Sequence, residues 1–249
     1  MMKVRIDKLL LDKNLAPSRA KAQAMIMAGI VLVNDKRVEK PSETFKSDEE
    51  IRIKGAANEI KFVGRGGLKL EKALNEFHIN VNECVCMDVG SSTGGFTDCL
   101  LKNGASRVYA IDVGTNQLVW KLRTDPRVVV FENTNARNLS SESFPEKFYL
   151  IVIDVSFISL TKILSGLLPL LHRNGKIIAL IKPQFEVGKG EVGKGGVVKD
   201  KEKQAQVVNE INKFAKGLGL FHQGTIESPI TGAAGNKEFL SCYEFSGAE

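Results

Sequence analysis

The chain lacks any apolar run of the roughly 18 residues that a membrane-spanning helix needs. Its longest apolar stretches, LIVIDVSFISL and KIIALIK, are interrupted by Asp154 or bounded by lysines. It has few cysteines, and the four present show neither a paired metal spacing nor a disulfide framework. The first residues, MMKVRIDKLL, contain no long apolar segment typical of a signal peptide. We therefore expect a cytoplasmic protein in a reduced setting, with no metal and no membrane partner.

Positive charge is present in excess, and it is distributed unevenly. The formal net charge is +6, and residues 1–63 hold 13 Lys and Arg against 9 Asp and Glu, whereas residues 64–249 hold 22 against 20. The N-terminal quarter therefore carries most of the basic bias, and a polyanion is its expected partner. A basic surface that is simply solvated is the alternative.

Residues 84–97, CVCMDVGSSTGGFT, form the most informative segment. An apolar run ends at Asp88, a glycine-rich turn follows, and an apolar segment can then open a helix. This order is typical of the entry to a doubly wound α/β sheet, where ligands bind at the carboxyl ends of the strands. The G-x-x-x-G-G spacing is neither the dinucleotide fingerprint nor a P-loop.

A second apolar run ends at Asp112, about 22 residues after Gly90. A carboxylate at that position can accept hydrogen bonds from both hydroxyls of a ribose. The two features together indicate an adenosine-containing ligand without a pyrophosphate, above all S-adenosylmethionine.

The remainder of residues 64–249 alternates strand and helix patterns. We expect strands at 84–89, 107–112, 127–131, 149–154 and 175–181, followed by an antiparallel pair at 220–227 and 238–245. The fold class predicted is α/β: a doubly wound, mostly parallel sheet with an antiparallel last strand and helices on both faces.

The N-terminal segment has a different pattern. Residues 3–13 are expected to form a helix with Ile6, Leu9 and Leu10 on one face. A second helix is expected to begin after Ser18 as N-cap and to end at Gly29. Short strand patterns follow in IVLVNDKRV and EIRIKG. Such a core is too small to be very stable alone, so we expect a small α+β module attached to a larger domain.

Charged residues stand at strand ends where active sites of such sheets collect. Asp154 follows LIVI, Lys182 follows IIALI, and Glu238 begins the last strand, while Lys69 lies just after the GRGG turn. A charge in such a place is partly desolvated and must be paired. A structural Lys–Asp pair at the edge of the sheet is the alternative to a catalytic role.

Residues 3–55 resemble the S4 RNA-binding module, through RIDKLL, SRAKAQAMIMAGIVLVNDKRV and the EIRIK strand. In that family the two helices face RNA. The resemblance implies that basic side chains bind phosphates, with little base selectivity. The residues so implicated are Arg5, Lys8, Arg19, Lys21, Lys36 and Arg37.

The whole chain resembles the TlyA family of ribosomal RNA 2′-O-methyltransferases, also labelled haemolysin A, which join an S4 module to a methyltransferase domain of the FtsJ (RrmJ) type. The matching stretches are GRGGLKLEKAL, DVGSSTGGFTDCLL, YAIDVGTNQL, DVSFISL, LIKPQFE and NKEFL. The resemblance implies an S4 domain at 1–57, a linker at 58–63 and a methyltransferase domain at 64–249. It also implies 2′-O-methylation of cytidine in large-subunit rRNA, and in some members of small-subunit rRNA too. The partner is then rRNA or a ribosomal subunit.

The family's catalytic set falls on Lys69, Asp154, Lys182 and Glu238. In this interpretation Lys182, held by Asp154, takes or shares the ribose 2′-OH proton, while Lys69 and Glu238 position the ribose and tune the lysine. No metal is required. The residues expected to bind S-adenosylmethionine are Asp88, Gly90, Ser91, Ser92, Gly94, Gly95, Asp112, Asn135 and Ala136.

Residues 183–200 are expected to form a mobile lid, and their Gly188–Lys194 string resembles a P-loop but has Gly195 where Ser or Thr is needed. Trp120 and Phe157 are expected to be buried, with stacking on a base as the alternative. A non-catalytic rRNA-binding or ribosome-assembly factor and a membrane-active haemolysin are the competing functions.

Overall fold

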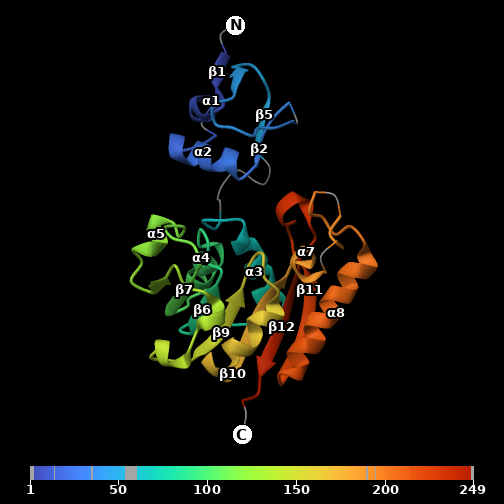
Figure 1. Ribbon diagram of the computed structural model, residues 1–249. Coiled ribbons are helices and arrows are strands. Elements are labelled where there is room, and N and C mark those ends of the chain that lie inside the picture. Colours follow the sequence, from blue (N-terminus) through green and yellow to red (C-terminus); the bar gives the residue numbers. More distant parts are fainter. Residues whose placement is uncertain are drawn as a thin grey trace. The chain divides into compact units, whose positions relative to one another are not determined.

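The computed structural model describes residues 3–13, 15–34, 36–53, 61–188, 190–193 and 195–247. The chain divides into two compact units, residues 1–60 and 61–249 (Figure 1). Of the linker expected at 58–63, the first three residues lie outside the described part of the chain. Within the second unit, Phe62 is buried and the Val63 amide donates to the Asp98 carboxylate.

The N-terminal unit contains two helices and short antiparallel strands. Its elements are β1 (Lys3–Arg5), α1 (Ile6–Asp12), α2 (Arg19–Met27), β2 (Val31–Val33), β3 (Lys36–Arg37), β4 (Thr44–Lys46) and β5 (Ile51–Ile53). Strand β1 pairs with β4, and β2 lies between β3 and β5. Ile6, Leu9 and Leu10 are all buried, as the helical spacing predicts.

The helix predicted at 3–13 begins later, at Ile6, and this part of the prediction is wrong. Residues 3–5 instead pair with β4, so their backbone groups are bonded in a ladder before the helix begins. The second helix agrees with its prediction: Ser18 Oγ accepts a hydrogen bond from the Lys21 amide at 3.2 Å. Gly29, just beyond the end of α2, has a positive φ of 68°.

The C-terminal unit is built on a seven-stranded sheet in the order β11-β12-β10-β9-β6-β7-β8. The strands β6, β7, β8, β9 and β10 run parallel, and β12 runs antiparallel to both of its neighbours, β10 and β11. This confirms the predicted fold class. The strands are β6 (Val85–Val89), β7 (Arg107–Ile111), β8 (Val128–Phe131), β9 (Phe148–Ile153), β10 (Leu171–Ile181), β11 (Leu220–Glu227) and β12 (Phe239–Phe245). The helices are α3 (Gly66–Glu76), α4 (Gly95–Lys102), α5 (Trp120–Arg123), α6 (Leu164–Leu167), α7 (Pro183–Glu186) and α8 (Lys201–Gly217), with short 3-10 turns between them.

Helices cover both faces of the sheet (Figure 1). Successive strand residues point to opposite faces, so Leu150 and Val152 pack with α3 and α4, whereas Ile151 and Ile153 pack with α6 and α8. A strand buried on both faces needs a continuous apolar run, which is what the LIVI of β9 supplies.

The order of the strands reverses at the centre of the sheet, because β7 and β8 lie on one side of β6 and β9 and β10 on the other. Strand β6 pairs with β7 on one side and with β9 on the other, so the crevice at their carboxyl ends is a topological switch point. Asp154 follows β9 and Lys182 follows β10 at this edge. Because β12 is antiparallel to β10, the residue before it, Glu238, lies at the same edge.

Candidate active site

The glycine-rich turn after β6 depends on residues without a side chain. Gly90 has a φ of 88°, and a Cβ there would overlap the carbonyl oxygen of Asp154. Gly94, at the N-cap of α4, has a φ of 100° and would overlap Leu122. The turn therefore brings the ends of β6 and β9 into direct backbone contact, a close approach that only glycine permits.

Asp88 lies beneath this turn and is completely buried. Its Oδ2 accepts a hydrogen bond from Thr97 Oγ1 at 2.7 Å, while its Oδ1 is buried without a partner. Burial raises the pKa of Asp88 to about 7, the hydrogen bond from Thr97 opposes this rise, and the nearby Asp154 charge adds to it. A buried oxygen without a hydrogen-bond donor is rare in native proteins and requires a physical explanation.

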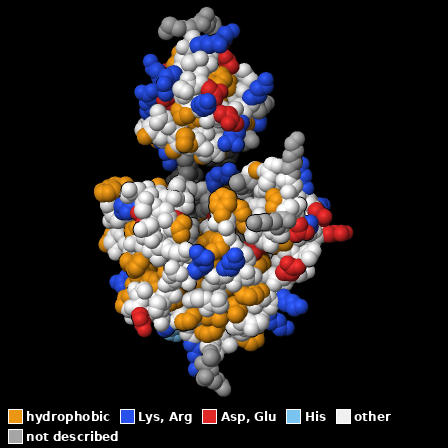
Figure 2. Space-filling view, viewed as in Figure 1, with side chains coloured by type: hydrophobic (Ala, Val, Ile, Leu, Met, Phe, Trp, Pro, Cys, Tyr) orange, Lys and Arg blue, Asp and Glu red, His pale blue; other side chains and the backbone are white. Residues whose placement is uncertain are grey.

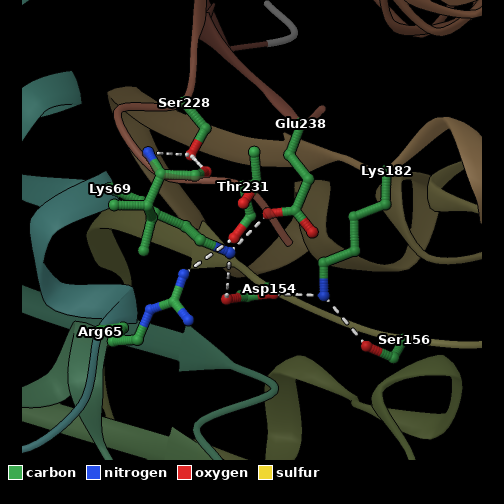
Figure 3. Close-up of polar contacts among 9 residues, drawn as sticks. Arg65, Lys69, Asp154, Ser156, Lys182, Ser228, Thr231 and Glu238 are labelled. Carbon is green, nitrogen blue, oxygen red and sulfur yellow. Dashed lines mark hydrogen bonds and ion pairs between the residues drawn. The ribbon is translucent and has the colours of Figure 1, made fainter. Parts of the chain in front are cut away.

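The four predicted catalytic residues form one chain of ionic contacts (Figure 3). Lys182 Nζ lies 2.6 Å from Asp154 Oδ1, and Lys69 Nζ lies 4.0 Å from Asp154 Oδ2. Lys69 Nζ also donates to Glu238 Oε2 at 2.6 Å. Two ammonium groups thus alternate with two carboxylates, and the charges of these four side chains sum to zero.

Among these four side chains, exposure is lowest at Glu238 and highest at Asp154. The Glu238 side chain is 2% exposed and that of Lys69 is 9% exposed, whereas Asp154 is 20% exposed. Lys182 Nζ also donates to Ser156 Oγ at 3.0 Å, beside its ion pair with Asp154. Breaking one partner of such a set would leave a buried charge, which is strongly unfavourable.

The buried Lys69–Glu238 pair is held in place by the segment 228–236, which precedes β12. A Cβ at Gly232 would overlap the Glu238 carboxylate, so this glycine allows the carboxylate to lie directly against the backbone. Arg65 Nη2 donates to the Thr231 carbonyl oxygen at 3.1 Å (Figure 3). The start of α3 and this segment therefore support the Lys69–Glu238 pair together.

A hollow of about 250 Å³ lies beside Asp154 and Lys182. It brings together the predicted residues Gly90, Ser91, Ser92 and Gly95 with the two ends of β9 and β10. Sequence reasoning missed the contribution of the turn before Lys69 and of Phe96, although GRGG is itself a visible signal. The lining is Gly64, Arg65, Gly66, Gly90, Ser91, Ser92, Thr93, Gly95, Phe96, Asp154, Ser156 and Lys182.

The other predicted cofactor residues lie outside this lining. Asp112 accepts hydrogen bonds from the Ser92 amide at 2.7 Å and the Gly114 amide at 2.8 Å, one on each oxygen. Asn135 caps a 3-10 turn through its side chain, and Ala136 is buried in the core. Gly94 lies against the Leu122 side chain, which leaves no room for a Cβ.

The burial expected for two aromatic residues is wrong. Phe157 is 90% exposed and Trp120 is 74% exposed. Phe157 has a φ of 65°, in the left-handed region that a bulky residue rarely adopts, and its ring lies 4.9 Å from that of Phe185. Because this conformation turns the chain just after Ser156, the ring is directed to the surface near Lys182.

The predicted RNA-binding residues all belong to the N-terminal unit, whose visible face carries Lys and Arg side chains on both sides, with acidic side chains between them (Figure 2). All are exposed except Lys21, which is half-buried. Arg5 and Arg19 both contact the buried carboxylate of Asp7. The guanidinium of Arg37 packs directly over Gly29.

The segment predicted as a lid is attached to the loop before β12. The Val198 amide donates to Asn236 Oδ1 at 3.1 Å, and Asn236 Nδ2 donates to the Gly196 carbonyl at 2.9 Å. Both lysines of the P-loop-like string, Lys189 and Lys194, lie outside the described residues. Its mobility remains a prediction.

Among the described residues, no group of three or more His, Cys, Asp and Glu side chains could hold a metal ion. Within the same ranges, no helix has the length and apolar character required to cross a membrane.

Comparison with known proteins identifies both units. The family model described as FtsJ-like methyltransferase matches residues 62–245, and the S4 domain model matches residues 4–51. A fold and a site of this kind define a methyltransferase. The chain belongs to the FtsJ-like methyltransferases that carry an S4 domain, in the TlyA family.

Individual relatives match over nearly the whole chain. YqxC of Bacillus subtilis (strain 168), provisionally named an rRNA methyltransferase, is 49% identical over 96% of this chain and 84% of its own. The 16S/23S rRNA (cytidine-2′-O)-methyltransferase TlyA of Mycobacterium tuberculosis (strain ATCC 25618 / H37Rv) is 44% identical over 96% of this chain and 88% of its own. A solved Streptococcus thermophilus structure, provisionally named a hemolysin, is 43% identical with a TM-score of 0.78, covering 100% of this chain and 90% of that one.

Proposed function

We propose that the protein transfers a methyl group from S-adenosylmethionine to the ribose 2′-OH of a cytidine in ribosomal RNA. The observation that carries this proposal is the Lys182–Asp154–Lys69–Glu238 chain of contacts beside a glycine-lined hollow. The cytidine and the rRNA come from the names of the relatives. Large-subunit rRNA is the first substrate to test, and small-subunit rRNA is the second.

The residues around the hollow fit S-adenosylmethionine. Gly90 and Gly95 remove side chains where backbone must approach a ligand, and the Asp88 Oδ1 below them is without a donor. Each oxygen of Asp112 accepts one amide and keeps acceptor capacity for a ribose hydroxyl. Asn135 and Ala136, after β8, are proposed for the adenine end. When bound, S-adenosylmethionine supplies an electrophilic sulfonium methyl group.

Lys182 has the position of the proton acceptor. Its ammonium group, paired here with Asp154, first loses a proton to solvent, and the neutral amine then takes the proton of the ribose hydroxyl. Nearly buried, Lys182 is held by Asp154 at 2.6 Å and by Ser156 at 3.0 Å, which fixes its Nζ toward the hollow. A ribose hydroxyl is a weak acid, so a nearby group that takes or shares its proton and stabilises the developing alkoxide accelerates attack. Lys69 and Glu238 keep Asp154 in place, because Lys69 bridges the two carboxylates.

The surface beside Lys182 is suited to a nucleotide base. Phe157 presents an exposed ring within contact of Phe185, and Lys182 Nζ lies 5.9 Å from the centre of the Phe185 ring. An aromatic face of this kind stacks on any unpaired base, a contribution of about 1–3 kcal/mol in single-stranded RNA recognition. The basic residues of the N-terminal unit are proposed to bind the RNA backbone.

The test is transfer of labelled methyl to unmodified ribosomal subunits and to free rRNA. We expect 2′-O-methylcytidine from the wild type, and a loss of about 10²–10⁴ in kcat for Lys182→Ala, with rRNA affinity retained. Lys216→Ala, which removes an exposed lysine from α8, is the matched control and should retain activity. A product methylated on the base would contradict the proposal.

The competing functions give different results in the same preparation. Tight rRNA binding without transfer to any ribosomal substrate would favour a non-catalytic assembly factor. Leakage of liposomes at low protein concentration would favour a membrane-active protein.

A further inference from the structure

Asp7 is the one acidic side chain that is fully buried in the described part of the N-terminal unit. It lies in the first turn of α1, and its Oδ1 accepts from Arg5 Nε at 3.0 Å. Its Oδ2 accepts from Arg5 Nη2 at 2.9 Å, from Arg19 Nε at 3.0 Å and from Gln23 Nε2 at 3.1 Å. One carboxylate therefore joins the end of β1 to two turns of α2.

These contacts crowd one oxygen of the carboxylate and leave the guanidiniums only partly used. Oδ2 accepts three hydrogen bonds and Oδ1 accepts one. The contacts to Asp7 use two of the five N–H donors of Arg5 and one of the five of Arg19. The side chains of Arg5 and Arg19 are 45% and 60% exposed, whereas that of Asp7 is 0% exposed.

The geometry holds two positive groups close together, which would otherwise repel each other. Because Arg5 Nη2 and Arg19 Nε share the single atom Asp7 Oδ2, the two guanidiniums cannot move apart without breaking a charge-assisted hydrogen bond. The three side chains together have a net charge of +1, and the exposed part of the cluster is cationic.

We propose that Asp7 is a positioning residue that orders Arg5 and Arg19 into one subsite for neighbouring phosphates of an RNA strand. The inference rests on the proposed RNA-binding function of the N-terminal unit. Planar guanidiniums bind phosphate best as oriented forks, so fixing two of them in advance lowers the entropy cost of binding. Asp7 acts through the arginines and does not touch RNA itself.

The sign of the effect of Asp7→Asn distinguishes positioning from simple charge. This variant raises the net charge by one, so a purely electrostatic view predicts equal or tighter RNA binding. We expect the reverse: about tenfold weaker binding of the full-length protein to labelled rRNA. We also expect the slope of log affinity against log salt to fall by about 1–2. Asp12→Asn, an exposed acid of the same helix, makes the same charge change and should bind as tightly as the wild type.

A second variant covers the case in which Asp7→Asn fails to fold. Arg5→Lys keeps the charge on a half-exposed side chain but loses the two-point contact with Asp7, and we expect about threefold to tenfold weaker binding. In methyl transfer to ribosomal subunits, both variants should raise KM and leave kcat unchanged. Wild-type affinity in both variants would overturn the proposal.

Failure of the underlying RNA-binding function has a different signature. If the double variant Arg5→Gln and Arg19→Gln binds rRNA as the wild type does, the N-terminal unit does not bind RNA through these residues, and the proposed role of that unit is wrong. If the double variant binds weakly while Asp7→Asn and Arg5→Lys bind normally, only the positioning role of Asp7 is wrong.

Discussion

A single carboxyl group, Asp88, makes the stability of the C-terminal unit depend on pH. Its pKa rises from 3.8 to about 7 on folding, mainly because burial disfavours the charged form. Between about pH 4 and pH 7 the folded protein keeps a proton that the unfolded chain has lost, so stability falls as pH rises through that window. The decrease amounts to a few kcal/mol and ends above pH 7.

Asp88→Asn removes this titration. We expect the free energy of unfolding of the variant, measured in urea at several pH values, to lack the decline that the wild type shows between pH 5 and 7. Thr97→Val removes the hydrogen bond that opposes the rise in the Asp88 pKa, so its decline should extend to higher pH. Identical profiles for wild type and Asp88→Asn would show that this carboxyl group is not protonated in the fold.

Individual site residues were predictable to different degrees. Asp154 and Lys182 stand at the ends of apolar strands, so sequence alone places them at one edge of a parallel sheet. Lys69 lies on a helix and Glu238 just before an antiparallel strand, and the family resemblance was needed to assign them a catalytic role. The exposure of Phe157 was not predictable, because apolar composition favours burial and the left-handed φ that exposes it leaves no sequence signal in a non-glycine residue.

The turn between β6 and α4 is the element on which the hollow depends. Gly94→Ala places a methyl group against Leu122 at a φ of 100°, and both the overlap and the backbone strain oppose folding. We expect a loss of about 2–4 kcal/mol in stability and weaker binding of S-adenosylmethionine, measured by urea unfolding and calorimetric titration.

Gly217→Ala is the matched control, because this exposed helical glycine at the end of α8 has no neighbouring atom within 4 Å of an added Cβ. It should be neutral or stabilising by up to about 1 kcal/mol. Equal stability of the two variants would show that the turn tolerates a side chain.

The presence of each strand in the sheet was more predictable than the residues at which it begins and ends. Apolar runs bounded by turns locate all seven strands, yet β10 begins at Leu171, earlier than the predicted 175, with an irregularity before Lys176. Leu171 pairs with Phe148 of β9 ahead of the polar HRNG stretch, and regular pairing resumes at Lys176, so the strand includes four residues that local pattern does not assign to it. The same cause, pairing of β1 with β4, shortens α1 at its start.

At the scale of the whole molecule, the cores are separate. One cluster of buried residues, with Ile6, Leu10 and Ile26, belongs to the N-terminal unit, and the two others lie on the faces of the large sheet. No described cluster combines residues of both units. A core as small as the first supports only marginal stability, whereas the larger unit buries a greater share of its surface.

We therefore expect calorimetry of the full chain to resolve two unfolding transitions. Saturating S-adenosylmethionine, at about 100 times its Kd, adds about 2.7 kcal/mol to the C-terminal unit and should raise that transition alone, by about 5–10 °C. An rRNA fragment should raise the transition temperature of the N-terminal unit. Asp7→Asn should lower that temperature and leave the transition of the C-terminal unit unchanged. A single transition that moves as a whole with either ligand would mean that the two units fold together, and that binding at one is coupled to the stability of the other.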